Sequence, residues 1–367
     1  MELALSRKDK LTYTRRNRFL VRLNNVARKF SIKFSFLSLI LFFSLGAKAQ
    51  LSTPWGEIAP FGRIFTGFVY NADPRIKPGK SFLFDAGILG LDYKLNDRIT
   101  AAIMYDVTRT TNFAYTDSLG ISNYFEGSKY TAYLKMGQIN WKFYPGFTLS
   151  VGQILSVQYL LPNDLWWGLR YVDVTAQEKF RYGMPADFGA LLSYQVNPRL
   201  KIKIGAVQGE GPFRHQNEES DFLYMAKLEY QPWPGWQFNV YYDYETIHPE
   251  LLKENKEVLS LFGGYKNEEW MVGVEYNSMK NANFECDHDR EMVSAYSSYN
   301  FYKNYGVFVR IDYGTLQLTG ADKHYYFIGG LQYTEDHNYF VSVNYRQNNY
   351  LINEDVSQYY VNFGLFF

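Results

Sequence analysis

The last ten residues of the chain, Gln358-Tyr-Tyr-Val-Asn-Phe-Gly-Leu-Phe-Phe367, alternate between two kinds of side chain. An unbroken apolar row runs through them to the terminus and consists of Tyr359, Val361, Phe363, Leu365 and Phe367. Because successive side chains of a strand point to opposite faces, this row is one face of a β-strand. Such a strand is an aggregation hazard at a free edge, and barrel closure removes the edge. The segment therefore predicts the last strand of a closed barrel, paired with the strand near Gly62.

The aromatic end of this strand adds an expectation about assembly. The row that finishes at Phe367 resembles the terminal signature by which outer-membrane proteins are recognised for barrel assembly. The resemblance implies that the five residues are an assembly signal. It also implies that the barrel-assembly machinery and outer-membrane lipid are partners. The alternative is an ordinary edge strand that finishes the chain.

The same alternation recurs through the chain from Gln50 onward. One example is residues 236–245, where Trp236, Phe238, Val240, Tyr242 and Tyr244 share one face and Gln237, Asn239, Tyr241, Asp243 and Glu245 share the other. A soluble β-sandwich also alternates, but here aromatic residues stand at the ends of the apolar rows. Aromatic girdles at both membrane interfaces are typical of transmembrane barrels.

Counting such segments predicts sixteen strands. Their approximate cores are 57–70, 81–94, 98–108, 130–143, 147–157, 187–196, 199–209, 222–231, 236–246, 257–265, 270–278, 292–302, 306–314, 323–334, 339–348 and 358–367. Short turns follow the even strands and longer loops follow the odd ones, which is the pattern of bacterial barrels with periplasmic turns and outer loops. We therefore expect an all-β fold, a transmembrane antiparallel β-barrel of about 16 strands over residues 50–367.

Composition agrees with this class. Aromatic residues make up 19% of the chain, and the mean hydropathy is −0.31. That hydropathy excludes a polytopic helical membrane protein, whereas a barrel needs only alternate strand residues to be apolar. The part that follows residue 49 is acidic and has no basic stripe, so nucleic acid is not an expected partner.

The first 49 residues have the features of a targeting segment. A basic region ending in Lys33 precedes an apolar stretch over 34–45, and Ala47-Lys48-Ala49 fits a small-x-small cleavage site. We predict that 1–49 is a signal peptide with an extended basic region, cleaved during export to the bacterial outer membrane. An uncleaved anchor is the alternative, although the apolar run is short for a membrane-spanning helix.

The longest predicted loop is the third outer one, over about 158–186. It is rich in aromatic residues and cations. In general porins the third loop folds into the lumen and sets the constriction. The resemblance implies that role for Trp166, Trp167, Arg170, Tyr171, Lys179 and Arg181. The alternative is a loop that packs outside the pore mouth or against a neighbouring subunit.

Ten charged residues fall on the polar faces of the predicted strands and are expected to face the lumen: Lys135, Lys201, Lys203, Lys227, Asp243, Glu245, Glu275, Arg310, Asp312 and Arg346. A ring of such charges would select ions. Alternatively, opposite charges pair across neighbouring strands and hold the barrel together.

Two short motifs carry a closer resemblance. The stretches Trp167-Gly-Leu-Arg-Tyr-Val-Asp173 and Ala186-Asp-Phe-Gly189 resemble the phosphate-selective porin O and P family. The resemblance implies sixteen strands, a homotrimer and a passive channel that passes anions such as phosphate.

No motif in the sequence predicts a metal site or a catalytic site. Cys286-Asp287-His288-Asp289 combines residue types that bind metals, but adjacent residues rarely converge on one ion, so we expect a solvated loop and no metal. No nucleophile with a base is evident, so neither an enzyme nor a cofactor is expected. A porin for small hydrophilic solutes or ions is the leading hypothesis. A non-conducting structural or adhesive barrel and a barrel enzyme are its rivals.

Overall fold

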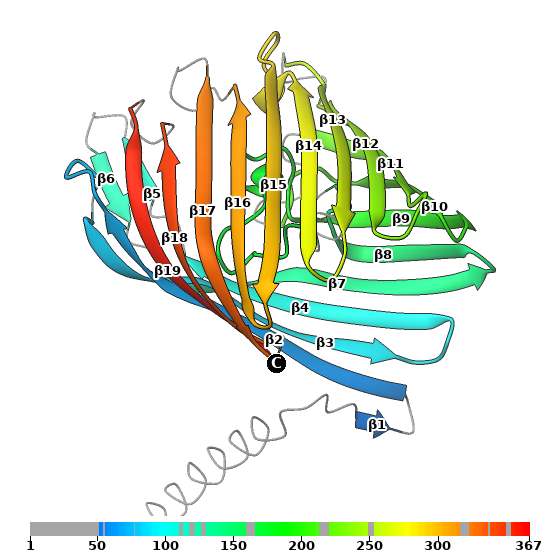
Figure 1. Ribbon diagram of the computed structural model, residues 1–367. Coiled ribbons are helices and arrows are strands. Elements are labelled where there is room, and N and C mark those ends of the chain that lie inside the picture. Colours follow the sequence, from blue (N-terminus) through cyan, green and yellow to red (C-terminus); the bar gives the residue numbers. More distant parts are fainter. Residues whose placement is uncertain are drawn as a thin grey trace, which may run out of the picture. The chain divides into compact units, whose positions relative to one another are not determined.

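The computed structural model describes residues 51–367 apart from 54–55, 77, 110–112, 117–121, 126–129, 159–165, 213–219, 249–252, 316–322, 337 and 350–353. The predicted signal peptide, 1–49, lies outside the described residues. The described part of the chain is almost entirely β-structure (Figure 1). Within it, no helix is long and apolar enough to cross a membrane.

Sixteen long strands form the barrel. They are β2 (Gly56–Asn71), β3 (Lys80–Lys94), β4 (Ile99–Arg109), β7 (Tyr130–Tyr144), β8 (Phe147–Leu155), β9 (Ala186–Asn197), β10 (Leu200–Val207), β11 (Ser220–Tyr230), β12 (Trp236–Ile247), β13 (Lys256–Lys266), β14 (Trp270–Lys280), β15 (Arg290–Tyr302), β16 (Tyr305–Gly314), β17 (His324–Glu335), β18 (Tyr339–Asn348) and β19 (Val356–Phe366). Each pairs antiparallel with its neighbours in chain order, and β19 pairs with β2. The predicted barrel, its strand count and its closure are therefore confirmed.

The connections divide the barrel into a short-turn end and a long-loop end. When the barrel strands are counted from β2, short turns follow the second, the fourth and every later even strand. The fourth strand is β7, and in the turn after it Gly146 has a φ of 80°. Long loops follow the odd-numbered members. The second of these holds a separate hairpin, β5 (Phe113–Thr116) with β6 (Ser122–Phe125). This hairpin and β1 (Leu51–Thr53) were not predicted, because strands of three or four residues are too short to show a period.

Burial along each strand is the reverse of that in a water-soluble sandwich. On β12 the outward Val240 is 45% exposed, whereas the inward Asn239 is 4% exposed. The apolar row thus faces the surroundings and the polar row faces the interior. Aromatic side chains gather at the strand ends, as in the stacked pair of Trp270 and Tyr299. A lipid-facing exterior with interfacial aromatic residues accounts for both features.

The end of the chain completes the closure. Phe367 and Gly62 exchange two backbone hydrogen bonds of 2.7 and 3.0 Å. The Phe367 ring also covers Gly62, because a Cβ at Gly62 would lie 2.4 Å from the ring. Glycine therefore leaves room for the tip of the terminal ring beside the first barrel strand at the seam.

We predict that Gly62→Ala lowers the free energy of unfolding by about 1–3 kcal/mol, because the added methyl group overpacks the seam. Urea unfolding in detergent measures the change. Gly79→Ala is the matched control, since a Cβ at Gly79 meets nothing within 4 Å. Equal stability of the two variants would show that the seam tolerates a side chain. Partial recovery of the free energy of unfolding in the double variant Gly62→Ala/Phe367→Leu would show that the methyl group clashes with the Phe367 ring.

Candidate functional site

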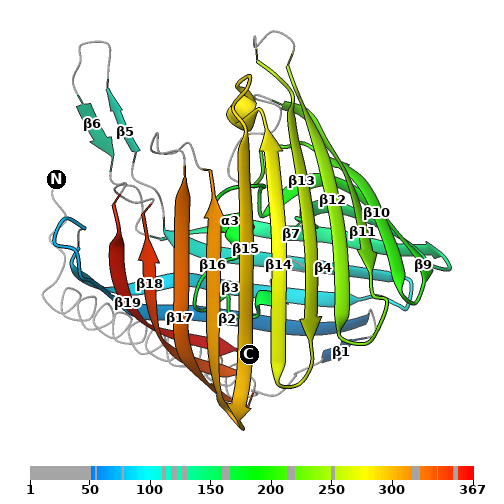
Figure 2. The same ribbon diagram turned by 45° about the horizontal axis from the view of Figure 1, so that its top comes forward.

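The described residues between β8 and β9 lie inside the ring of strands (Figure 2). Its described parts are residues 156–158 and 166–185. It contains one turn of helix, α3 (Ala176–Lys179), whose first turn is capped by the hydroxyl of Thr175. We call these two described segments, 156–158 and 166–185, the inner loop.

Aromatic side chains fasten the inner loop to one wall of the barrel. The Trp167 ring lies edge-on to Tyr296 and Phe308 from neighbouring strands, with centroids 5.6 and 6.2 Å away. Tyr171 packs on Phe340 at 5.3 Å. It also approaches Gly364, where a Cβ would lie 2.7 Å from the Tyr171 Cβ. This packing buries one face of the inner loop against β15–β19.

Trp166 extends the contact toward β12 and β13. Its indole nitrogen donates to Oε1 of Gln237 at 3.1 Å, and its ring lies 5.4 Å from that of Phe262. Trp166, Trp167 and Tyr171 were predicted at the constriction. The structure places all three against the wall, with 8%, 1% and 1% of their surface exposed.

An ionic cluster at Asp173 holds the same face of the inner loop. Its carboxylate accepts a hydrogen bond from Lys179 at 2.9 Å and one from the Tyr326 hydroxyl at 2.8 Å. Two wall guanidiniums, Arg310 and Arg346, lie 3.8 and 3.9 Å from it. Burial would raise the pKa of Asp173, but Lys179, Arg346 and Arg310 together hold it well below its ordinary value. The carboxylate is therefore ionised at neutral pH.

The two wall arginines also bind the backbone of the inner loop. Arg310 donates to the carbonyl of Val174 at 2.6 Å, and Arg346 donates to that of Val172 at 2.6 Å. Arg310 in addition pairs with Asp312 at 2.8 Å. These predicted lumen-facing residues thus serve as partners of the loop, through the carbonyls on either side of Asp173.

Another pair of charges on the inner loop lies near the wall formed by β4 and β7. Arg170 pairs with Glu178 at 2.5 Å, and the wall carries Lys135, which pairs with Asp106 at 2.7 Å. Burial would raise the pKa of Glu178, but Arg170 and, further away, Lys135 hold it below its ordinary value. The charge of Lys135 on the wall therefore acts on the ion pair of the inner loop.

A β-bulge accounts for the position of Lys135. Met104 pairs with Met136 and Tyr105 pairs with Leu134, so Lys135 is the extra residue. Both Lys135 and Met136 are buried, which breaks the strict alternation there.

The remaining predicted residues of the lumen also lie on inner faces. Lys203 pairs with Glu229 at 2.8 Å, and Lys227 donates to the carbonyl of Val157 at 2.5 Å. Glu245 pairs with Lys256. The others of this group are Lys201, Asp243 and Glu275. In the inner loop, Arg181 is exposed and has a φ of 57°.

A cavity of about 640 Å³ opens at the short-turn end beside β7–β10. Its polar walls include Gln138, Asn140 and Ser193. Its charged lining residues are Asp97, Arg98, Lys142, Lys201 and Lys203, four basic and one acidic. We call it the basic vestibule.

The motif Cys286-Asp287-His288-Asp289 lies in the turn between β14 and β15. Cys286 is exposed, and Nδ1 of His288 lies 2.5 Å from a carboxylate oxygen of Glu285. Within the described ranges, no group of three or more His, Cys, Asp or Glu side chains is placed to hold a metal ion.

We predict that Asp173→Asn lowers the free energy of unfolding by about 3 kcal/mol or more, because Lys179 and the buried Arg346 then lose the carboxylate beside them. Urea unfolding gives the value, and thiol labelling of Leu169→Cys in a Cys286→Ser background reports release of the inner loop. Asp73→Asn is the control, since its partner Arg75 is half-exposed and also pairs with Glu354, and ion pairs at the surface contribute little. Unchanged stability and labelling in Asp173→Asn would contradict the anchoring role.

No family model matches the chain, and no curated protein matches its sequence. Solved structures match its fold. DcaP of Acinetobacter baumannii, described as an outer membrane channel, has a TM-score of 0.65 at 11% identity and covers 87% of this chain and 100% of its own. OmpF of Salmonella typhi, solved with daunomycin, has a TM-score of 0.61 at 13% identity with the same coverage.

OmpT of Vibrio cholerae, an outer membrane protein solved in a trimer form, has a TM-score of 0.56 at 12% identity. It covers 85% of this chain and 99% of its own. At these identities the likeness shows the fold alone. This chain is a closed sixteen-stranded antiparallel barrel with the fold of outer-membrane porins.

Proposed function

We propose that the protein is a porin of the bacterial outer membrane, through which small hydrophilic solutes pass by passive diffusion. The observation that carries the proposal is the inner loop, which is fastened to one wall and leaves a polar vestibule beside the other. A sixteen-stranded barrel is wide enough for an aqueous lumen. The description of DcaP as an outer membrane channel supports the same function.

The membrane orientation follows from the connections. In outer-membrane barrels the short turns face the periplasm and the long loops face outward. The basic vestibule then opens to the periplasm. Residues 1–49 would direct export, outer-membrane lipid would surround the apolar rows, and the barrel-assembly machinery would recognise the strand ending at Phe367. The trimer form of OmpT supports a homotrimer here.

We place the constriction between two ion pairs that influence each other electrostatically, Arg170–Glu178 on the inner loop and Lys135–Asp106 on the wall. Lys179 does not line the constriction directly but pairs with Asp173, which holds the inner loop in place. Arg181 lies away from these pairs, at the rim of another pocket. Fixed charges at a narrow point select among ions by their sign and size.

The charge of the basic vestibule favours anions. Four basic residues and one acidic residue border it. Such a surplus raises the local concentration of negative solutes. A preference for anions agrees with the resemblance to the phosphate-selective porins. The vestibule lysines would attract any small anion, because they provide charge without a geometry specific to phosphate. We therefore propose a preference for anions in general.

One observation favours a second candidate, a non-conducting barrel that acts through its outer loops. The side chains of Lys135 and Asp106 are only 4% and 6% exposed, so the lumen is closely filled at this level. A conductance measurement separates the two candidates.

Purified protein in a planar bilayer should give stepwise conductance, and in a KCl gradient its reversal potential should show anion preference. Lys142→Gln with Lys201→Gln should reduce the ratio of anion to cation permeability by about twofold, because two of the vestibule's charges are lost. Lys280→Gln is the control, since Lys280 lies at the long-loop end of β14 and pairs with Glu257.

Silence over many insertions would contradict the channel and favour the second candidate. Conductance with an unchanged ratio in the double variant would leave the channel intact and contradict the role of the vestibule.

A further inference from the structure

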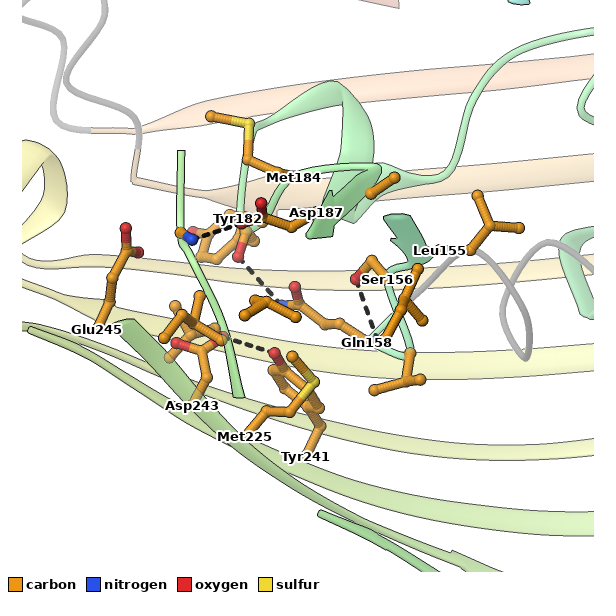
Figure 3. Close-up of a pocket in the computed structure, with 18 of the residues that line it drawn as sticks. Leu155, Ser156, Gln158, Tyr182, Met184, Asp187, Met225, Tyr241, Asp243 and Glu245 are labelled. Carbon is orange, nitrogen blue, oxygen red and sulfur yellow. Dashed lines mark hydrogen bonds between the residues drawn. The ribbon is translucent and has the colours of Figure 1, made fainter. Parts of the chain in front are cut away.

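A second cavity lies on the other side of the base of the inner loop (Figure 3). It has a volume of about 80 Å³ and is bordered by the inner loop and by strands β8–β14. Figure 3 shows Tyr182, Met184 and Asp187 on one side, with Met225, Tyr241 and Asp243 opposite. We call it the outer pocket. It shares Ile154, Val157 and Leu191 with the lining of the basic vestibule but none of its basic residues.

The walls of the outer pocket are mostly apolar. They include the side chains Leu155, Leu191, Val207, Leu223, Met225 and Val258. Met184 and Met279 add two flexible thioethers, which adapt to ligands of different shape. An apolar pocket inside an otherwise polar lumen would bind the hydrocarbon part of a solute.

Two buried carboxylate oxygens in this pocket make no hydrogen bond, but Oε2 of Glu245 lies beside the ammonium of Lys256, which leaves Oδ1 of Asp243. Asp243 is 2% exposed, and its Oδ2 accepts a hydrogen bond from the Tyr241 hydroxyl at 2.8 Å. Its Oδ1 is buried and makes no hydrogen bond of normal geometry in the part of the chain that the structure describes, where the backbone N–H of Val258 is the other donor close to this carboxylate. A buried acceptor without a donor is unfavourable, so a donor from outside the protein is expected there.

The charges around Asp243 leave a negative surplus. Lys256 pairs with Glu245 and also lies 4.9 Å from the centre of the Phe284 ring. Two carboxylates on β12 therefore share one lysine. Asp187 across the pocket is a third acid, and both its oxygens accept backbone hydrogen bonds, from Gly209 and Phe188.

The rim of the outer pocket is reached from solvent. Met184 is 40% exposed, and Arg181 beside it is exposed as well. Two cations are among the described residues that line the pocket, Lys256 and Arg181, and Arg181 lies at the rim. Its exposure lets water screen its charge, whereas Asp243 acts from the buried floor.

We propose that the outer pocket binds small amphipathic amines, with the ammonium group donating to Oδ1 of Asp243 and the hydrocarbon chain lying between Met184, Met225 and Leu191. A charge-assisted hydrogen bond in a buried site is stronger than one between neutral groups. The site therefore selects a cationic head on an apolar body. This binding goes beyond the proposed channel and requires no conduction.

Calorimetry on the full-length barrel in amphipol tests the site with two probes of equal size, n-butylammonium and 1-butanol. The amine should bind at least about tenfold more tightly than the alcohol, since only the amine supplies a charged donor. Asp243→Asn should abolish this preference and leave weak binding of the alcohol. Asp92→Asn, an inner-face carboxylate of β3 outside the pocket, is the matched control and should keep the preference.

Equal affinity of the two probes for the wild-type barrel would overturn the proposal, whether or not Asp243→Asn folds. An undiminished preference in a folded Asp243→Asn barrel would overturn it as well. Because binding is measured at equilibrium, its failure leaves the channel untouched. Silence in a bilayer likewise leaves the binding site untouched.

Discussion

The contact of Asp173 with the barrel wall decides how the interior of this protein is arranged. Its carboxylate meets Lys179, Tyr326 and two arginines, and those arginines also bind the carbonyls on either side of it. A buried carboxylate is tolerated only when it is paired and hydrogen-bonded, and here both conditions are met. The inner loop is therefore fixed to β15–β19, and the free part of the lumen lies beside β7–β10.

The two faces of the sheet differ in polarity and therefore in the surroundings that they need. The outer face is apolar and suits lipid. The inner face is polar and must find hydrogen-bond partners in water or in the chain itself. The inner loop supplies such partners with its carbonyls and with Gln177, which donates to Asn277 at 2.6 Å. Beside the loop lie two spaces of opposite character, the basic vestibule and the outer pocket with its acidic floor.

Much of the fold was predictable from the sequence, since a period of two over ten residues is a local signal. The sixteen strands and their turns follow from that period, and the pairing of the last strand with the strand near Gly62 follows from the need to close the sheet edge. The path of the inner loop was not predictable in detail, because its anchors are remote in sequence. Asp173 meets Arg346, and the alternation carries no sign of that contact. The bulge that directs Lys135 inward has no sequence signal either.

Thiol modification in single channels tests most directly on which wall the loop lies. In a Cys286→Ser background, Ser193→Cys lines the basic vestibule, whereas Ser342→Cys replaces a side chain that is 1% exposed on the covered wall. A cationic methanethiosulfonate reagent should change the current through Ser193→Cys and leave Ser342→Cys unaffected. Rapid modification of Ser342→Cys with no effect at Ser193→Cys would show that the open passage runs along the other wall, and would contradict the account.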